Sequence, residues 1–156
     1  MLAKQVGASL VARGWRLAVA ESATGGLVGH WITQVSGSSQ YFWGGIIAYA
    51  DEVKMKLLGV REESLIRWGA VSPQVAVEMA SGACDSVGAD VSVSITGIAG
   101  PTGATATKPV GLYYVGLACP SERWAWRHVL HGDRQANNEA IAQLALEHLR
   151  DYLSAH

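Results

Sequence analysis

Ala20-Glu21-Ser22-Ala23-Thr24-Gly25-Gly26 is the stretch that best indicates the fold of this chain, because it joins a predicted strand to a predicted helix. The apolar run from Leu17 to Ala20 predicts a buried strand, and the apolar pattern from Leu27 to Val35 predicts a helix. The hydroxyls and glycines between them indicate a tight turn. Such a junction presents backbone N–H groups and the positive end of the helix to a ligand. Ser22 is then expected at the carboxyl end of its strand, where ligands bind in open α/β sheets.

A purely structural explanation of this stretch is also available. Serine and threonine are common helix caps and turn residues, and glycine often follows them. The stretch matches neither the G-x-S-x-G elbow nor the phosphate-binding G-x-x-x-x-G-K-[ST] loop. A chemical role for Ser22 therefore depends on the rest of the chain.

The composition indicates one ordinary globular domain over residues 1–156, long enough to bury its own core. Apolar residues make up 49% and charged residues 16% of the chain, and with 18 glycines but 4 prolines the glycines are expected to mark turns. Twelve basic and thirteen acidic residues give a net charge of −1, which offers no electrostatic footprint for nucleic acid or an anionic membrane. The chain lacks a long apolar run, and Lys4 and Arg13 interrupt any signal-peptide core. We expect a cytoplasmic protein with neither nucleic-acid nor membrane partners.

Metal, cofactor and disulfide chemistry have little support in the sequence. Cys84 and Cys119 are too few and too far apart for a disulfide scaffold or a zinc site. The five histidines lack the spacing of a motif such as H-E-x-x-H. We expect neither a metal nor a cofactor. Six tryptophans in a chain of low charge suggest an apolar surface that is buried in a homo-oligomer.

Strand and helix patterns alternate along the chain. Helices are expected over residues 2–13, 27–35, 52–58, 62–68, 73–87 and 134–153, and strands over 17–20, 44–49, 90–96, 111–118 and 122–130. The strand over 44–49 is apolar and β-branched, which is typical of a buried strand. The last two strands form a hairpin. This order predicts an α/β fold with a mixed sheet and helices on both of its faces.

Tyr49 and Lys54 are the second group of candidates. Tyr49 closes a predicted strand and Lys54 lies in the first turns of the next helix, which Asp51 is expected to cap. Both would lie at the same sheet edge as Ser22 if the two strands are parallel neighbours. A serine nucleophile needs a base, and a lysine can serve if burial or a neighbouring cation lowers its pKa. Alternatively, Lys54 and Lys56 solvate an exposed helix face; at roughly 200° apart, only one can face the site.

A glycine-rich loop is the third candidate. The strand that ends in Thr96 is followed by Gly97, Gly100 and Gly103 at intervals of three, and such glycines let a backbone approach a ligand closely. A long surface connection is the alternative explanation. Lys108, at the end of the loop, is expected to be a solvated charge.

The start of the last helix is the fourth candidate. Arg134 follows Gly132-Asp133 and could hold a phosphate in a bidentate manner, assisted by the helix N-terminus. Asp133 is expected to be the N-cap of this helix.

Together, these stretches resemble the C-terminal domain family of the competence-damage-inducible (CinA) proteins, whose stand-alone members include nicotinamide-mononucleotide amidohydrolases. The resemblance covers residues 2–153. It is carried by six stretches in the same order, at residues 20–26, 45–60, 69–72, 96–101, 108–111 and 132–134.

The resemblance implies a single-domain three-layer α/β/α sandwich with a mixed central sheet, acting as a metal-independent amidohydrolase. In this reading Ser22 attacks the carboxamide of nicotinamide mononucleotide, and Lys54 takes the hydroxyl proton, directly or through Tyr49. Backbone N–H groups near Gly25 and Gly26 would hold the oxyanion. Water would then release nicotinate mononucleotide after ammonia has left.

The resemblance also implies which residues bind the substrate: Thr24, Gly25, Gly26, Thr96, Gly97, Gly100, Gly103 and Arg134. The chain departs from the family at Ala23, where the family usually has cysteine, and at residues 102–107, where it has a glycine-rich run with an acidic residue. A second arginine is common where Asn138 stands. A catalytically silent nucleotide-binding or partner-interaction module is the alternative function.

Overall fold

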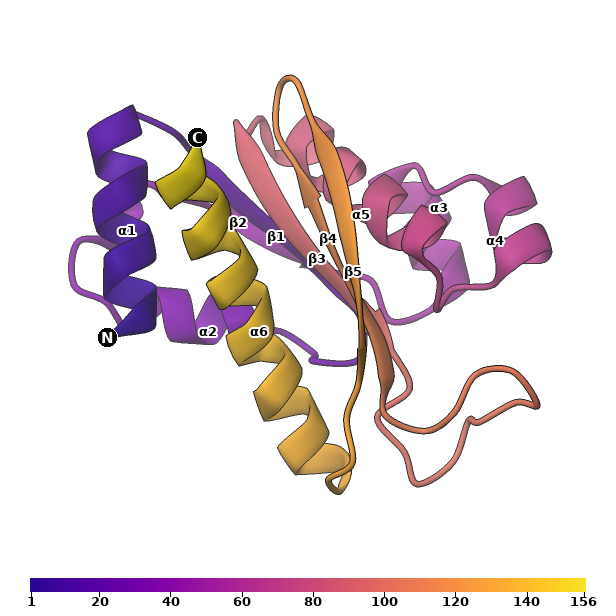
Figure 1. The fold of residues 1–156 in the computed structure, drawn as a ribbon. Coiled ribbons are helices and arrows are strands. Elements are labelled where there is room, and N and C mark those ends of the chain that lie inside the picture. Colours follow the sequence, from indigo (N-terminus) through magenta and orange to yellow (C-terminus); the bar gives the residue numbers. More distant parts are fainter.

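A five-stranded mixed sheet with the strand order β2-β1-β3-β4-β5 forms the middle layer of the molecule (Figure 1). The computed structural model describes residues 1–156. The strands are β1 (Leu17–Glu21), β2 (Phe42–Ile47), β3 (Val91–Gly97), β4 (Leu112–Ala118) and β5 (Arg123–Val129). Strand β1 pairs in parallel with β2 and β3, whereas β4 is antiparallel to both β3 and β5. The predicted mixed sheet and terminal hairpin are confirmed.

Helices cover both faces of this sheet (Figure 1). On one face lie α1 (Leu2–Arg13), α2 (Leu27–Thr33) and α6 (Arg134–Ala155), and on the other lie α3 (Asp51–Leu58), α4 (Glu62–Trp68) and α5 (Pro73–Val87). A short 3-10 turn, η1 (Ser38–Gln40), precedes β2. This arrangement is the predicted α/β/α sandwich. None of the helices combines the length and apolar character needed to cross a membrane.

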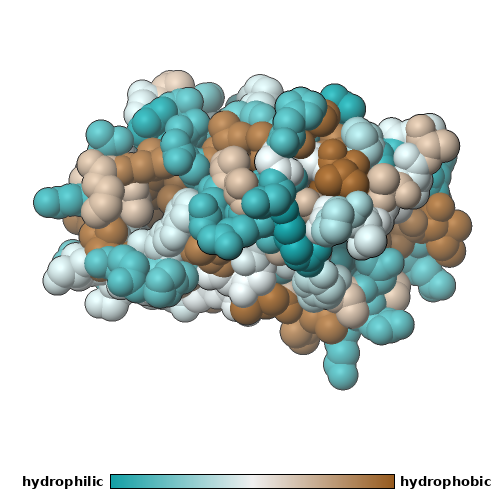
Figure 2. All heavy atoms as spheres, turned by 90° about the horizontal axis from the view of Figure 1, so that it is seen from below, coloured by the Kyte–Doolittle hydropathy of each residue, from teal (hydrophilic) through white to brown (hydrophobic).

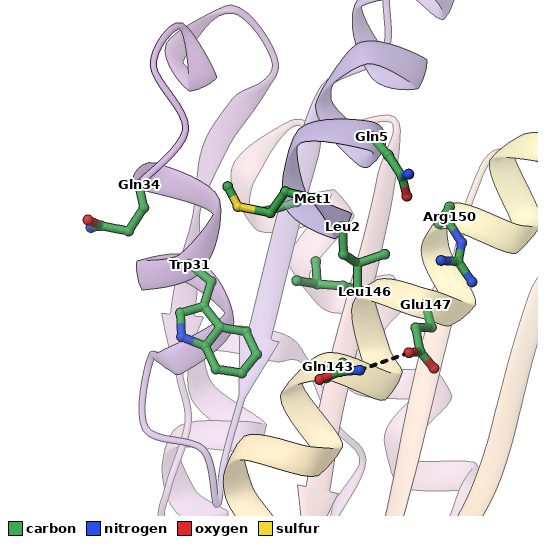
Figure 3. A pocket seen from close by; sticks show the side chains of 10 residues that line it. Met1, Leu2, Gln5, Trp31, Gln34, Gln143, Leu146, Glu147 and Arg150 are labelled. Carbon is green, nitrogen blue, oxygen red and sulfur yellow. Dashed lines mark hydrogen bonds between the residues drawn. The ribbon is translucent and has the colours of Figure 1, made fainter.

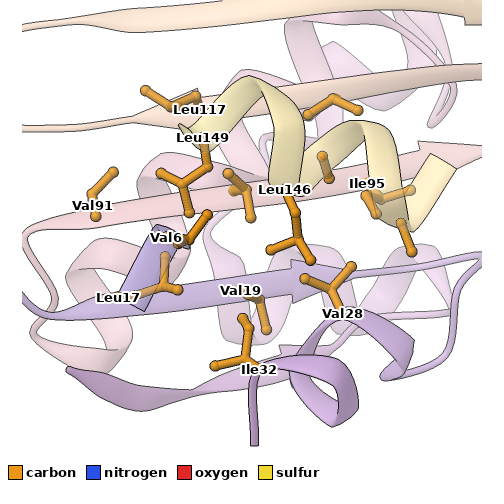
Figure 4. Packing of buried hydrophobic residues seen from close by; sticks show 14 of the residues in the cluster. Val6, Leu17, Val19, Val28, Ile32, Val91, Ile95, Leu117, Leu146 and Leu149 are labelled. Atoms are coloured by element: carbon orange, nitrogen blue, oxygen red, sulfur yellow. The ribbon is translucent and has the colours of Figure 1, made fainter. Parts of the chain in front are cut away.

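Strand β1 is buried along its whole length because the two helical layers pack on its opposite faces. Leu17 and Val19 belong to a core of 23 buried residues under α1, α2 and α6. Figure 4 shows Leu146 of α6 among them. Ala18 and Ala20 belong to a smaller core of 8 buried residues on the α5 side. The small side chains on that face explain how α5 packs closely against β1.

Strand β2 differs from the predicted buried strand over residues 44–49. It spans Phe42–Ile47 at the edge of the sheet, and its residues alternate between half-buried and exposed. Trp43 and Ile47 are 49% and 56% exposed. The apolar run indicated burial on both faces, but an edge strand is also open along its outer side. Gly45 is required there, since a Cβ would come within 2.4 Å of the Val19 side chain.

The contact between α3 and α5 depends on one glycine. A Cβ on Gly82 of α5 would lie 1.7 Å from the main-chain oxygen of Leu58, the last residue of α3. No side-chain rotation relieves a clash with main chain, so any larger residue moves α3. Gly29 of α2 is a matched contrast, because its nearest atoms would be 3.6 Å or more from a Cβ.

We therefore expect Gly82→Ala to destabilise the protein by about 1–3 kcal/mol, because α3 must move away from α5. Gly29→Ala should leave stability unchanged or raise it by up to about 1 kcal/mol, since alanine favours a helix. Urea unfolding of both variants measures the difference. Equal stability of the two variants would contradict the packing described here.

Candidate active site

Ser22 and Lys54 meet at the carboxyl end of β1. The Lys54 Nζ lies 3.1 Å from the Ser22 Oγ and also donates a hydrogen bond to the main-chain oxygen of Tyr49 at 2.9 Å. Ser22 is 7% exposed and Lys54 is 2% exposed. The strand pairing explains the meeting, because β1 and β2 are parallel neighbours and their following loops lie side by side. The Lys54 side chain thus faces Ser22 and is not exposed to solvent on the surface of α3.

Burial lowers the pKa of the Lys54 ammonium, because removal from water disfavours its charged form. The Asp51 carboxylate, 3.7 Å away, raises that pKa and opposes the effect of burial. Asp51 was predicted to cap α3, but Ala50 occupies the N-cap position and Asp51 is the first helical residue. Asp51 lies three positions before Lys54, so both side chains lie on one side of α3.

Glu21 occupies the N-terminus of α2, which the sequence predicted to be free for a ligand. Its carboxylate accepts hydrogen bonds from the N–H groups of Val28 and Gly29, both at 3.0 Å, and from the Thr24 hydroxyl at 2.6 Å. Val28 and Gly29 are the second and third residues of α2, the positions that an N-cap normally satisfies. The Glu21 carboxylate therefore occupies the N-terminus of α2, and the Thr24 hydroxyl stabilises the turn by donating to it.

The turn between β1 and α2 keeps three main-chain donors free. The N–H groups of Ala23, Thr24 and Gly26 have no acceptor within the chain, whereas Gly25 donates to the Ser22 oxygen at 3.1 Å. Of the predicted donors, Gly26 is therefore available and Gly25 is not. A developing oxyanion beside Ser22 would find its donors among these free groups.

Arg134 links two loops at this end of the sheet. Its Nη2 donates to the Tyr49 hydroxyl at 3.2 Å, and its Nη1 donates to the main-chain oxygen of Gly100 at 2.9 Å. Asp133 is the N-cap of α6, as predicted, and accepts from the Ala136 N–H at 2.8 Å. Arg134 forms no ion pair with any carboxylate of the chain. Tyr49 meets Lys54 through its main-chain carbonyl, not through its hydroxyl.

Thr96 and Gly97, both predicted to bind substrate, have structural roles. The Thr96 hydroxyl is buried and donates to the main-chain oxygen of Ala70 at 2.8 Å. Gly97 lies against Tyr113, because a Cβ there would be 2.1 Å from the aromatic ring. Both residues thus contribute to the packing between β3, β4 and the segment before α5.

In the later part of the glycine-rich loop, residues 101–107 are exposed, whereas Gly100 is buried. Gly100 has a φ of 87°, so its left-handed backbone favours glycine, and its carbonyl receives Arg134. Gly103 is exposed. Lys108 is half-buried rather than solvated, since its Nζ donates to the main-chain oxygen of Trp68 at the end of α4.

The sequence interpretation missed two buried polar residues that hold the site together. Glu21 is one of them. Asn137 is the other: it is 1% exposed, donates to the Ala99 oxygen at 3.1 Å and accepts from the Gly132 N–H at 2.9 Å. A carboxylate directly before a turn with unfilled N–H groups was an available signal for Glu21. Asn137 had no comparable signal, because the carbonyl to which it donates, that of Ala99, is 38 residues away in the sequence.

Two surface cavities adjoin Arg134. One of about 440 Å³ is lined by Thr24, Leu27, Arg134, Gln135, Asn138 and Glu139. The other, of about 470 Å³, lies between the α6 N-terminus and the loop at Ala99 and Pro101. Seen from this end of the molecule, hydrophilic and hydrophobic side chains are interspersed (Figure 2). A larger cavity, of about 580 Å³, lies elsewhere, between α1, α2 and α6 (Figure 3).

Comparisons with known proteins agree on one family. Residues 1–153 match the family described as the CinA C-terminal domain. The chain is 52% identical to a CinA-like protein of Salinibacter ruber, covering 96% of this chain and 36% of that protein. It is 43% identical to a CinA-like protein of Chloroherpeton thalassium, covering 99% of this chain and 38% of that protein. The chain therefore spans little more than a third of the length of these relatives.

Solved structures match over nearly their whole length. The crystal structure of a competence-damaged protein (CinA) superfamily protein from Klebsiella pneumoniae superposes with a TM-score of 0.96 at 31% identity, covering 99% of this chain and 97% of that chain. A competence/damage inducible protein from Agrobacterium tumefaciens gives a TM-score of 0.93 at 35% identity, covering 98% and 93% of the two chains.

The cap formed by Glu21 has a measurable consequence. Glu21→Ala should destabilise the protein by about 2 kcal/mol or more, because two helix N–H groups and a buried hydroxyl lose a charged acceptor. Glu62→Ala is the control, since Glu62 is an exposed residue in the first turn of α4 and its loss should cost less than about 0.5 kcal/mol. Urea unfolding at neutral pH compares the two variants. A loss at Glu21 as small as that at Glu62 would exclude this role.

Proposed function

The chain belongs to the CinA C-terminal domain family, and on that premise we propose that it is an amidohydrolase that converts nicotinamide mononucleotide into nicotinate mononucleotide and ammonia. The observation that carries the proposal is the buried contact of 3.1 Å between the Lys54 Nζ and the Ser22 Oγ. A serine hydroxyl becomes an effective nucleophile when a base lies within hydrogen-bond reach. The choice of substrate rests on the resemblance to family members with this activity.

The reaction begins with the neutral amine of Lys54. It accepts the hydroxyl proton while the Ser22 Oγ attacks the carboxamide carbon, and the carbonyl oxygen becomes an oxyanion. The free N–H groups of Ala23, Thr24 and Gly26 are the donors available to it. The Lys54 ammonium then gives its proton to the departing nitrogen, which leaves as ammonia. Ser22 is left as an acyl ester.

Hydrolysis of this ester uses the same two groups. Lys54 accepts a proton from water, and the resulting hydroxide attacks the acyl carbon. The carbon–oxygen bond to Ser22 breaks, and Lys54 returns the proton to the serine oxygen. The products are nicotinate mononucleotide and the free enzyme. No step in this scheme calls for a metal ion.

Lys54 rather than Tyr49 is the immediate base in this proposal. The Tyr49 hydroxyl is engaged by Arg134 at 3.2 Å, and Tyr49 is 63% exposed. Its main-chain carbonyl instead holds the Lys54 Nζ at 2.9 Å. Tyr49 therefore positions the base through its backbone.

Arg134 is the group that we assign to the substrate phosphate. It carries a charge that no carboxylate of the chain neutralises, and it borders both cavities at this end of the sheet. A guanidinium matches a phosphate with paired N–H donors. The nucleotide would then extend from Ser22 toward the α6 N-terminus along the loop at Gly100.

The first test removes each catalytic group. Ser22→Ala and Lys54→Met should abolish ammonia release from nicotinamide mononucleotide, whereas Lys56→Met, on the exposed side of α3, should retain it. Retained turnover in Ser22→Ala would remove this residue from the mechanism. If the wild-type protein shows a thermal shift with the nucleotide but releases no ammonia, the silent binding module is the better description.

Lys54→Met should also fold normally. Burial lowers the pKa of Lys54, so the unfolded chain holds this proton more tightly than the folded chain. The ammonium therefore opposes folding below its folded-state pKa, and the effect disappears as pH rises toward the ordinary lysine value. At neutral pH the unfolding temperature of Lys54→Met should be no more than about 3 °C below that of the wild type. A larger fall would indicate a structural role.

The second test shifts the pKa of the proposed base, Lys54. Because only neutral Lys54 accepts a proton, kcat/KM should rise with pH through the pKa of this residue. Asp51 raises that pKa, so Asp51→Asn should move the rise to lower pH. Glu52→Gln, one residue further along α3, is the control and should leave the profile in place. A profile that is unchanged or moves to higher pH in Asp51→Asn would contradict the assignment of Lys54.

A further inference from the structure

The loops on either side of β1 are joined across the end of that strand. Tyr49 follows β2 by two residues, and Gly100 follows β3 by three, while β1 lies between β2 and β3. Arg134 contacts the Tyr49 hydroxyl and the Gly100 oxygen together. The three residues thus form a bridge across the end of β1, where Ser22 is 7% exposed.

The two ends of this bridge are held unequally. On the β3 side, the first turn of α6 is fixed to the loop by two hydrogen bonds, from Arg134 to the Gly100 oxygen at 2.9 Å and from buried Asn137 to the Ala99 oxygen at 3.1 Å. On the β2 side, one contact of 3.2 Å joins Arg134 to Tyr49, whose side chain is exposed. The Tyr49 contact is therefore the one that can open while the rest stays in place.

Opening this contact does not require Lys54 to move. The Lys54 Nζ is held by the main-chain oxygen of Tyr49, whereas the Arg134 contact is made by the hydroxyl at the far end of the same residue. Rotation of the Tyr49 side chain separates the hydroxyl from Arg134 and leaves the carbonyl where it is. The base and the bridge can thus act independently.

The geometry points to a substrate-operated latch, formed by the hydrogen bond between the Tyr49 hydroxyl and Arg134, which restricts access to Ser22 until an anionic group of the substrate takes Arg134. This inference rests on the proposed hydrolase function and adds a reason for its specificity. A phosphate oxygen is a stronger acceptor for a guanidinium than a neutral hydroxyl, so the anion displaces Tyr49. Recognition of the anion and access to the nucleophile are then one event.

The latch makes a prediction about substrates without a phosphate. Nicotinamide riboside presents the same carboxamide but has no group to displace Tyr49. It should therefore be hydrolysed poorly by the wild-type protein, and free inorganic phosphate should increase its hydrolysis by opening the latch from outside. The same phosphate should inhibit the hydrolysis of nicotinamide mononucleotide, because it competes for Arg134.

The experiment measures ammonia release from both substrates, with and without inorganic phosphate, in the wild type and in Tyr49→Phe. The ratio of kcat/KM for the mononucleotide to that for the riboside should fall at least about fivefold in Tyr49→Phe. Phosphate should stimulate riboside hydrolysis in the wild type and much less in this variant. Chloride at matched ionic strength and the variant Tyr114→Phe, which removes another hydroxyl, are the controls.

The ratio separates a latch from other roles of Tyr49. Loss of a catalytic or structural contribution would lower the rates for both substrates together and leave their ratio unchanged. If the mononucleotide is hydrolysed while the ratio is unaltered in Tyr49→Phe and phosphate does not stimulate riboside hydrolysis, the latch is refuted and the proposed function stands. If the wild type releases no ammonia from the mononucleotide, the proposed function fails, and the latch fails with it.

Discussion

A lysine that the fold removes from water and places 3.1 Å from a serine oxygen is the constraint on which the rest of this structure depends. A buried ammonium is unfavourable unless it is partnered or gives up its proton. The structure supplies two neutral oxygens, from Ser22 and Tyr49, and only one exposed carboxylate, from Asp51. The parallel pairing of β1 with β2 brings these groups together. Gly82 of α5 lets α3 pack closely, so that the Lys54 side chain reaches Ser22.

Two charged residues near this pair have different roles: Glu21 stabilises the fold, and Arg134 is available to the substrate. Glu21 neutralises the start of α2, so the helix end is part of the scaffold and the turn itself keeps the free N–H groups. Arg134, in contrast, is held by neutral oxygens only, and its charge stays available. A site with a base, free main-chain donors and one uncompensated cation is suited to a carboxamide that carries a distant anion.

The sequence predicted the parts of this site that depend on local patterns. The passage from β1 through the turn to α2, the helix over residues 73–87 and the cap at Asp133 each follow from residues close together in the chain. The burial of β2 was predicted wrongly, because an apolar run does not reveal whether a strand lies at an edge. The partners of Thr96, Lys108 and Asn137 could not be predicted either, since each bonds a main-chain carbonyl more than 25 residues away. Glu21 could have been found, because a carboxylate precedes a turn rich in unfilled donors.

An NMR titration of the protein with ¹³C-labelled lysine side chains measures whether Lys54 is ready to accept the Ser22 proton. The signal of Lys54, identified by its absence in Lys54→Met, should titrate below the ordinary lysine pKa of about 10.4, because burial disfavours the ammonium form. A Lys54 signal that titrates at or above the ordinary value would contradict the account.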